Sequence, residues 1–188
     1  YTIQSYTIDF SYDTRDVIFN PSQGEFHVFS WEKGFRFYKD SLDFDKYNLG
    51  LHKFFKTFDK QCLATRLSFD YLRSPDIADQ DIFYSQMFIV GGSTTVRGYE
   101  DMFPFAFGTK RVLLSLEYRF LFNDTFQGII FTDAGYATTN DILALRNYRM
   151  GKGLGIRFMI PALGPLRLDL GIDDLGVARL HFNVGHTF

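Results

Sequence analysis

Apolar and polar residues alternate along most of the second half of the chain. In residues 179–188 the even positions are Leu, Phe, Val, His and Phe, whereas the odd positions are mostly polar. Residues 166–173 repeat the pattern, with Leu and Ile at even positions and Arg, Asp and Gly at odd ones. A period of two is typical of a β-strand with one apolar and one polar face. The same alternation predicts further strands at 110–122, 126–136 and 150–160.

The first half of the chain alternates less regularly. Residues 2–13 have a clear apolar face, whereas 24–57 carries lysines and aromatic residues on both faces. We predict strands at 2–13, 24–38, 42–57 and 61–73, and leave the phase of the second and third open. This makes about nine strands, each of roughly the nine to eleven residues that a tilted membrane strand requires. Bacterial barrels have even strand numbers. Either the first strand belongs to a larger barrel of about sixteen strands, or it does not pair as a full strand and eight close.

Three segments stand out between or within these strands. Residues 74–108 have no helical or strand period, and loops of this length are usually functional. Residues 161–165 begin and end with proline, and we expect neither proline to lie inside a strand ladder. The alternating glycines of 151–155 superficially suggest a phosphate loop. They open a strand and not a helix, so we expect them to permit bending or close approach.

Composition favours a membrane barrel over a soluble domain. Aromatic residues make up 19% of the chain, with 23 Phe and 11 Tyr, although charged residues reach 22%. This combination suits an apolar outer band, aromatic girdles and a polar lumen. No apolar run approaches the ~20 residues that a membrane helix requires. The chain has 20 Lys and Arg against 22 Asp and Glu, so no basic excess indicates a nucleic-acid partner.

One arginine in the long aperiodic segment is the main candidate for a functional site. Residues 88–99 read Phe-Ile-Val-Gly-Gly-Ser-Thr-Thr-Val-Arg-Gly-Tyr, which places Arg97 between glycines. A buried arginine requires carboxylate partners, and the following strands supply Glu117 and Asp133. Both acids fall on the inward face by alternation, and a guanidinium group can bridge two carboxylates. We therefore predict that 74–108 folds into the lumen and that Arg97 pairs there with both acids.

The chain resembles the C-terminal barrel part of the BamA-like outer-membrane assembly factors, the bacterial surface-antigen superfamily. Four motifs in order carry the resemblance, and the end of the chain resembles the terminal strand and assembly signal of that family. The motifs are Asp13-Thr14-Arg15-Asp16 with Asn20-Pro21 and Gly24; Gly91-Gly92 with Val96-Arg97-Gly98-Tyr99; Phe131-Thr132-Asp133-Ala134-Gly135; and Gly153-Leu154-Gly155-Ile156-Arg157-Phe158 with Gly164-Pro165-Leu166-Arg167-Leu168-Asp169. The terminal-strand signal comprises Phe182, Gly185 and Phe188.

The resemblance implies an all-β, transmembrane antiparallel barrel of the bacterial outer membrane, rather than of an organelle's outer membrane. It implies assembly and insertion of outer-membrane proteins. The implied partners are the lipid bilayer, unfolded outer-membrane protein clients and accessory assembly lipoproteins. In that family the Arg-Gly-Tyr loop enters the lumen from outside, and by resemblance Arg97 is its arginine, with Asp133 and Glu117 as partners. We expect one barrel domain, 1–188, without the family's periplasmic domains.

No residues indicate an enzyme, a metal site or a cofactor. Cys62 is single, and no Ser/His/Asp or Cys/His set is recognisable. His181 and His186 point to opposite faces of one strand and cannot share a metal. We therefore expect no catalytic residues. Two other functions stay open: a polypeptide translocation pore of the two-partner secretion kind, which shares the loop motif, and a small closed structural barrel without insertase activity.

Overall fold

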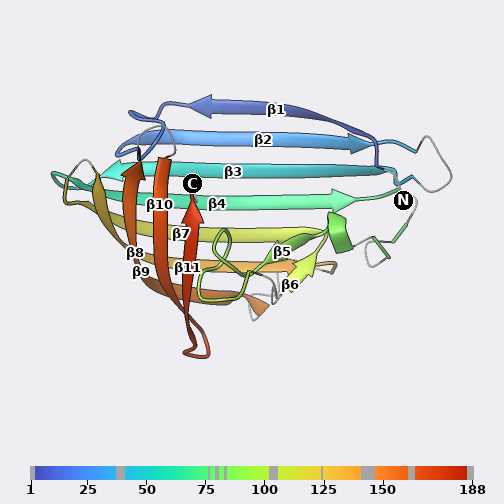
Figure 1. Cartoon of the computed structure of the whole chain (residues 1–188). Coiled ribbons are helices and arrows are strands. Elements are labelled where there is room, and N and C mark those ends of the chain that lie inside the picture. The colour runs from blue at the N-terminus through green and yellow to red at the C-terminus, as the bar shows by residue number, and fades with distance from the viewer. Residues whose placement is uncertain are drawn as a thin grey trace.

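The computed structural model describes residues 3–36, 41–75, 77–78, 81–82, 84–101, 106–123, 125–140, 147–160 and 164–185. Within these ranges nine strands form one antiparallel sheet, each pairing with the next along the chain (Figure 1). They are β1 (Ser5–Asp13), β2 (Gly24–Gly34), β3 (Phe44–Lys56), β4 (Gln61–Arg73), β7 (Lys110–Leu121), β8 (Phe126–Thr138), β9 (Arg149–Ile160), β10 (Gly164–Asp173) and β11 (Ala178–Val184). All nine predicted strands are thus confirmed, with differences only at their ends. In the same ranges, no helix has the length and hydropathy needed to cross a membrane.

The sheet is strongly curved. In Figure 1, β1 to β4 run side by side across the view, whereas β8 to β11 turn until β10 and β11 stand across the front. The sheet wraps around the segment between β4 and β7, which contains the short strands β5 (Phe88–Val90) and β6 (Ala106–Gly108) and the turn η2 (Tyr84–Gln86). β1 pairs with β2 over its whole length. The interpretation in which the first strand does not pair fully is therefore wrong.

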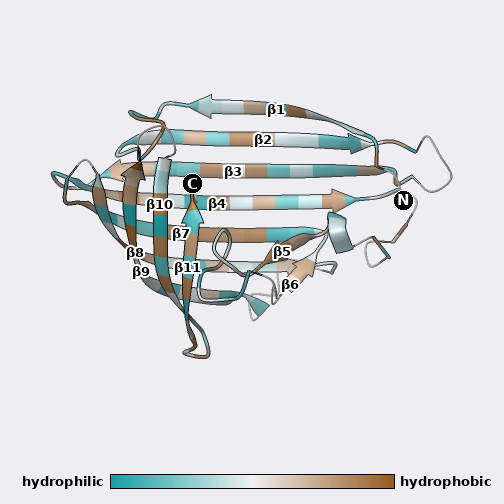
Figure 2. Cartoon of the chain, viewed as in Figure 1, coloured by the Kyte–Doolittle hydropathy of each residue, from teal (hydrophilic) through white to brown (hydrophobic). Residues whose placement is uncertain are grey.

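Burial alternates along the strands and defines two faces. In β7, Ser115 and Glu117 are buried, whereas Leu114 is 42% exposed. Figure 2 shows the same alternation as bands of teal and brown along β8 to β11. We call the face that carries Glu117 the inner face and the other the outer face. The outer face is apolar, as expected where a strand meets lipid.

The structure also gives the phase of β2 and β3, which the sequence left open. Phe44 and His52 of β3 are buried on the inner face, opposite Gly34 and Phe26 of β2. A Cβ at Gly34 would overlap the Phe44 ring, so the glycine makes room for it. Aromatic side chains lie on both faces here. That arrangement removes the contrast between apolar and polar positions on which a prediction of phase depends.

Pro165 lies inside β10, so the prediction that neither proline enters a ladder is wrong for this residue. Hydrogen-bonded pairs alternate along an antiparallel ladder. Pro165 and Gly185 form the last hydrogen-bonded pair between β10 and β11. The Gly185 N–H donates to the Pro165 carbonyl at 2.8 Å, whereas Pro165 has no N–H to donate in return. The ladder loses one bond at its end, where sheets tolerate proline. Pro161 lies outside the described residues.

Connections differ between the two ends of the sheet. At the end that we call the short-turn end, the connections are 14–23, 57–60, 122–125 and 161–163. At the opposite end, the long-loop end, the connections are 35–43, 74–109, 139–148 and 174–177, and 74–109 is the longest. Outer-membrane barrels have short turns on the periplasmic side and longer loops outside. By this rule the long segment enters from the outer side of the membrane.

Two apolar clusters join the long segment to the inner face of the sheet. The first combines residues of the segment with residues at β3 and β4, which precede it, and the second combines residues of the segment with residues of β7 and β8, which follow it, so the segment packs as part of the core. One cluster comprises Leu42, Phe44, Leu72, Ile82 and Phe88, and the other comprises Val90, Val96, Tyr99, Leu113 and Ala137.

Candidate functional site

The candidate site is the tip of the long segment, where two glycines turn the chain. Gly91 and Gly92 have φ angles of 129° and 103°, a region that favours glycine. The Gly91 N–H donates to Thr95 Oγ1 at 2.8 Å, and the Gly92 N–H donates to the Val96 carbonyl at 3.1 Å. This turn fixes the backbone just before Arg97 and directs the arginine toward the sheet.

Arg97 is fully buried and meets carboxylates from three strands. Its Nε and Nη2 donate to the two oxygens of Asp133 in β8, at 2.7 and 2.9 Å. Its Nη1 donates to Glu117 Oε1 in β7 at 2.7 Å and to Asp169 Oδ2 in β10 at 3.4 Å. The centroid of the Phe131 ring lies 3.6 Å from the guanidinium carbon, within cation–π range. The structure thus brings Arg97 together with Glu117 and Asp133, and adds Asp169 and Phe131.

Three further arginines share these carboxylates. Glu117 accepts from Arg119 at 3.0 and 2.8 Å and from Arg157 at 3.1 Å. Asp169 accepts from Arg157 at 2.5 Å and from Arg167 at 3.0 Å. All of these side chains are buried. An ionised carboxylate offers about four acceptor positions, so each shared acid can neutralise and hydrogen-bond more than one guanidinium group.

The loop backbone lies directly on the backbone of β9 and β10. A Cβ at Gly151 would overlap the Arg97 carbonyl oxygen, and one at Gly171 would overlap the Gly98 nitrogen. Gly98 itself has a φ of 101°, and a Cβ there would meet the Ile172 carbonyl carbon at 2.8 Å. The glycines at the start of β9 therefore permit close approach of another segment. This agrees with the expectation from the sequence.

The fold and the order of these motifs match a known family. A model of the Omp85 superfamily domain matches residues 1–188. The chain belongs to the Omp85 superfamily. It is 36% identical over 109 residues to Outer envelope protein 80, chloroplastic, of Arabidopsis thaliana, a match that covers 53% of this chain and 15% of that protein. The crystal structure of BamA from Haemophilus ducreyi lacking POTRA domains 1–3 is similar with a TM-score of 0.70 and 14% identity, over 95% of this chain and 40% of that one.

These matches confirm the resemblance inferred from the sequence, at the level of a BamA-like Omp85 barrel. The Omp85 chain spans less than half the length of each of the two proteins. It is an integral outer-membrane protein with an antiparallel barrel fold. At the level of the superfamily, the matches support a role in outer-membrane protein assembly or translocation.

Tyr99, the last residue of the loop motif, binds the turn between β10 and β11. Its Oη donates to Asp174 Oδ1 at 2.5 Å, and the same carboxylate accepts from Arg149 at 2.9 Å. Burial and this bond raise the pKa of Tyr99 above its usual value. The bonds from Tyr99 and Arg149 lower the pKa of Asp174. The phenol therefore remains protonated and donates to an ionised carboxylate.

Phe182 and Gly185, two of the three predicted terminal-strand residues, do not join the Arg97 cluster. Phe182 is 65% exposed on the outer face of β11, opposite to the lumen. Gly185 follows the strand with a φ of 101° and donates to the Pro165 carbonyl. Phe188 lies outside the described residues, as does His186.

Sequence reasoning missed the roles of Phe131, Asp169 and the arginines that share the acids. The available signal was the alternation along the strands, because all of these residues have inward parity. Alternation assigned their face but not their neighbours across the sheet. The residues missed are Arg119, Phe131, Arg157, Arg167 and Asp169.

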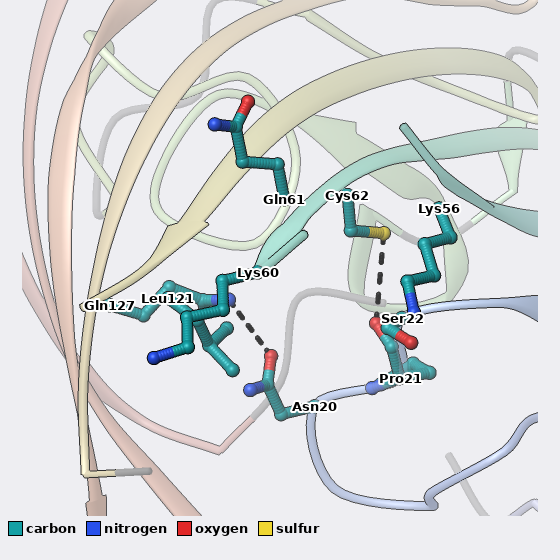
Figure 3. Close-up of a pocket in the computed structure, with 9 residues that line it drawn as sticks. All are labelled: Asn20, Pro21, Ser22, Lys56, Lys60, Gln61, Cys62, Leu121 and Gln127. Carbon is teal, nitrogen blue, oxygen red and sulfur yellow. Dashed lines mark hydrogen bonds between the residues drawn. The ribbon is translucent and has the colours of Figure 1, made fainter. Parts of the chain in front are cut away.

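A second loop, residues 14–23, meets the inner face at the short-turn end (Figure 3). Gln127 of β8 donates to Asn20 Oδ1 at 3.0 Å, and the Cys62 thiol of β4 faces the Pro21 carbonyl at 3.8 Å. The Asn20-Pro21 motif thus joins β4 and β8, and loops from both ends cover the inner face. A cavity of about 140 Å³ lies beside this loop, lined by Asn20, Pro21, Ser22, Lys56, Lys60, Gln61, Cys62, Leu121 and Gln127.

We predict that Arg97→Ala lowers the free energy of unfolding by about 3–5 kcal/mol, because the buried acids lose the positive charge that compensates them. Arg149→Ala is the matched control. Its side chain is 49% exposed and pairs with Asp174, so its loss should cost about 0–1 kcal/mol. Urea unfolding in liposomes measures both. Equal losses would contradict the assignment of Arg97 as the anchor.

We further predict that Gly171→Ala displaces the loop tip, because the new methyl group meets the loop backbone and cannot be accommodated by a rotamer change. Trypsin should then cleave after Arg97, at a rate well above that of the native protein. Gly50→Ala is the control, since a Cβ there meets only the tips of Val28 and His52, at 3.0 and 3.3 Å. Protection from trypsin in both variants would show that the loop does not rest on these glycines.

Proposed function

We propose that this Omp85 chain forms the part of an outer-membrane barrel at which unfolded outer-membrane proteins are inserted into the bilayer. The observation that carries the proposal is the loop that Arg97 fixes to β7, β8 and β10 and that also bonds to the inner face of the edge strand β11. In the described part of the chain, β11 pairs with β10 alone. A client strand can therefore approach its other edge while the loop supports it from inside.

The free edge of β11 has identifiable hydrogen-bonding groups. Gly185 bonds to Pro165 of β10, and bonded pairs alternate along an antiparallel ladder. The backbone groups of Leu180 and Phe182 therefore point away from β10. An extended client segment can bind such groups by adding a strand to the sheet.

The process as proposed needs no enzyme chemistry. It exchanges backbone hydrogen bonds between a client and a sheet edge, which requires neither a catalytic residue nor a cofactor. The partners in this proposal are the lipid bilayer and unfolded outer-membrane protein clients, together with the accessory assembly lipoproteins that the family resemblance implies. The wider activity depends on parts of the longer relatives that this chain does not span.

We predict that Phe182→Pro abolishes the acceleration of client folding, whereas Phe182→Ala retains it. Both variants lose the ring, but only proline removes the N–H at the free edge. The measurement is the folding rate of an unfolded outer-membrane protein into liposomes that contain each variant, compared with empty liposomes.

Equal acceleration by the two variants would contradict strand addition at this edge. Planar-bilayer conductance distinguishes insertion from the alternative function, a polypeptide translocation pore. A chain that does not accelerate client folding, but opens a wide conductance when residues 74–108 are deleted, would be a translocation pore.

A further inference from the structure

The inner face of β11 is bonded to the long segment at three successive inward positions. Arg179 Nη1 donates to the Gly98 carbonyl at 2.6 Å, and Asn183 Nδ2 donates to Ser93 Oγ at 3.0 Å. Between them, the buried His181 bonds to the segment through both ring nitrogens. In the described part of the chain, β11 pairs with one strand, β10. The long segment also holds β11, through these side-chain bonds on its inner face.

The bonds of His181 require one protonation state. The Gly98 N–H points at Nε2 at 3.1 Å, so Nε2 accepts and carries no proton. Nδ1 lies 3.2 Å from Asp101 Oδ2, an acceptor, so Nδ1 carries the proton of the neutral ring. In the imidazolium form both nitrogens are donors. Nε2–H would then face the Gly98 N–H, and the bond between the strand and the loop tip would be lost.

We propose that His181 is a positioning residue that accepts the bond from the Gly98 N–H of the loop tip only while its imidazole is neutral. Histidine is the side chain whose charge changes between about pH 5 and 8. Protonation of the ring releases the Gly98 N–H from His181. The bonds of Arg97 do not involve His181, so the loop stays in the lumen while β11 loses the bond from the Gly98 N–H and keeps the one to Asp101. This coupling does not depend on whether the chain inserts clients.

Charged groups of both signs surround His181. The acids are Asp101 of the loop and Asp169, its register partner in β10. The bases are Arg179 on the same strand and Arg167 on β10. Both acids also have other donors: Asp101 accepts two bonds of 2.7 Å from within the loop, and Asp169 serves three arginines. The remaining charged groups nearby, Glu100 and Asp173, pair with Arg179.

The test uses the full chain in lipid nanodiscs, with the Gly98 amide followed by NMR between pH 8 and pH 5. Its protection against exchange, corrected for the intrinsic rate, should fall about tenfold as the His181 ring titrates, as expected for one lost hydrogen bond. His181→Gln retains an uncharged acceptor at this position and should keep constant protection. The ring nitrogen shifts of the native chain should show a proton on Nδ1 and none on Nε2 at pH 8.

Three results would overturn the proposal. The first is unchanged protection of the Gly98 amide in the native chain while the His181 ring becomes doubly protonated. The second is the same pH dependence in His181→Gln, which would place the sensor elsewhere. The third is a proton on Nε2 at pH 8, which is read from the native chain and needs no variant.

Discussion

Burial of the Arg97 guanidinium is the constraint on which the rest of the structure depends. A charged group taken out of water costs several kcal/mol unless it is paired and fully hydrogen-bonded. The paired acids come from β7, β8 and β10, so they converge only when these strands have the observed register. Without Arg97, the same acids would lose a major share of the positive charge that compensates them. The loop and the sheet therefore stabilise each other, and neither arrangement is favourable alone.

The register explains why a hollow exists for the loop. Glu117 pairs with Phe131 across β7 and β8, and Phe131 pairs with Gly153 in β9. In a neighbouring row Asp133 pairs with Gly151. Along the sheet, acidic and aromatic side chains thus give way to glycine. The guanidinium group lies over the acids and the Phe131 ring, while the loop backbone rests on Gly151 of β9 and Gly171 of β10.

Much of this could be predicted from the sequence wherever the two faces differ in polarity. The strands from 110 onward alternate clearly, so their faces and the inward position of Glu117 and Asp133 followed from parity. The grouping with Arg97 followed from the requirement that a buried arginine has acidic partners. In β2 and β3, by contrast, aromatic side chains occupy both faces, and the phase could not be derived.

The remaining contacts depend on distances along the chain that no local pattern encodes. Asp169 lies 72 residues from Arg97, and Asn20 lies 107 residues from Gln127. Parity assigns a face to each, but only the register across intervening strands brings them together. The position of Pro165 was wrongly predicted for a related reason. A ladder tolerates proline where the missing N–H removes only one terminal hydrogen bond, and this depends on the register with the neighbouring strand.

The most direct test of the central claim is a double-mutant cycle between Arg97→Ala and Asp133→Ala, measured by unfolding in liposomes. If the pair holds the loop in the lumen, the two losses overlap. The double variant should then be more stable than the sum of the single losses predicts, with a coupling of about 2–3 kcal/mol. Additive losses, with a coupling below about 0.5 kcal/mol, would show that Arg97 does not anchor the loop through this acid.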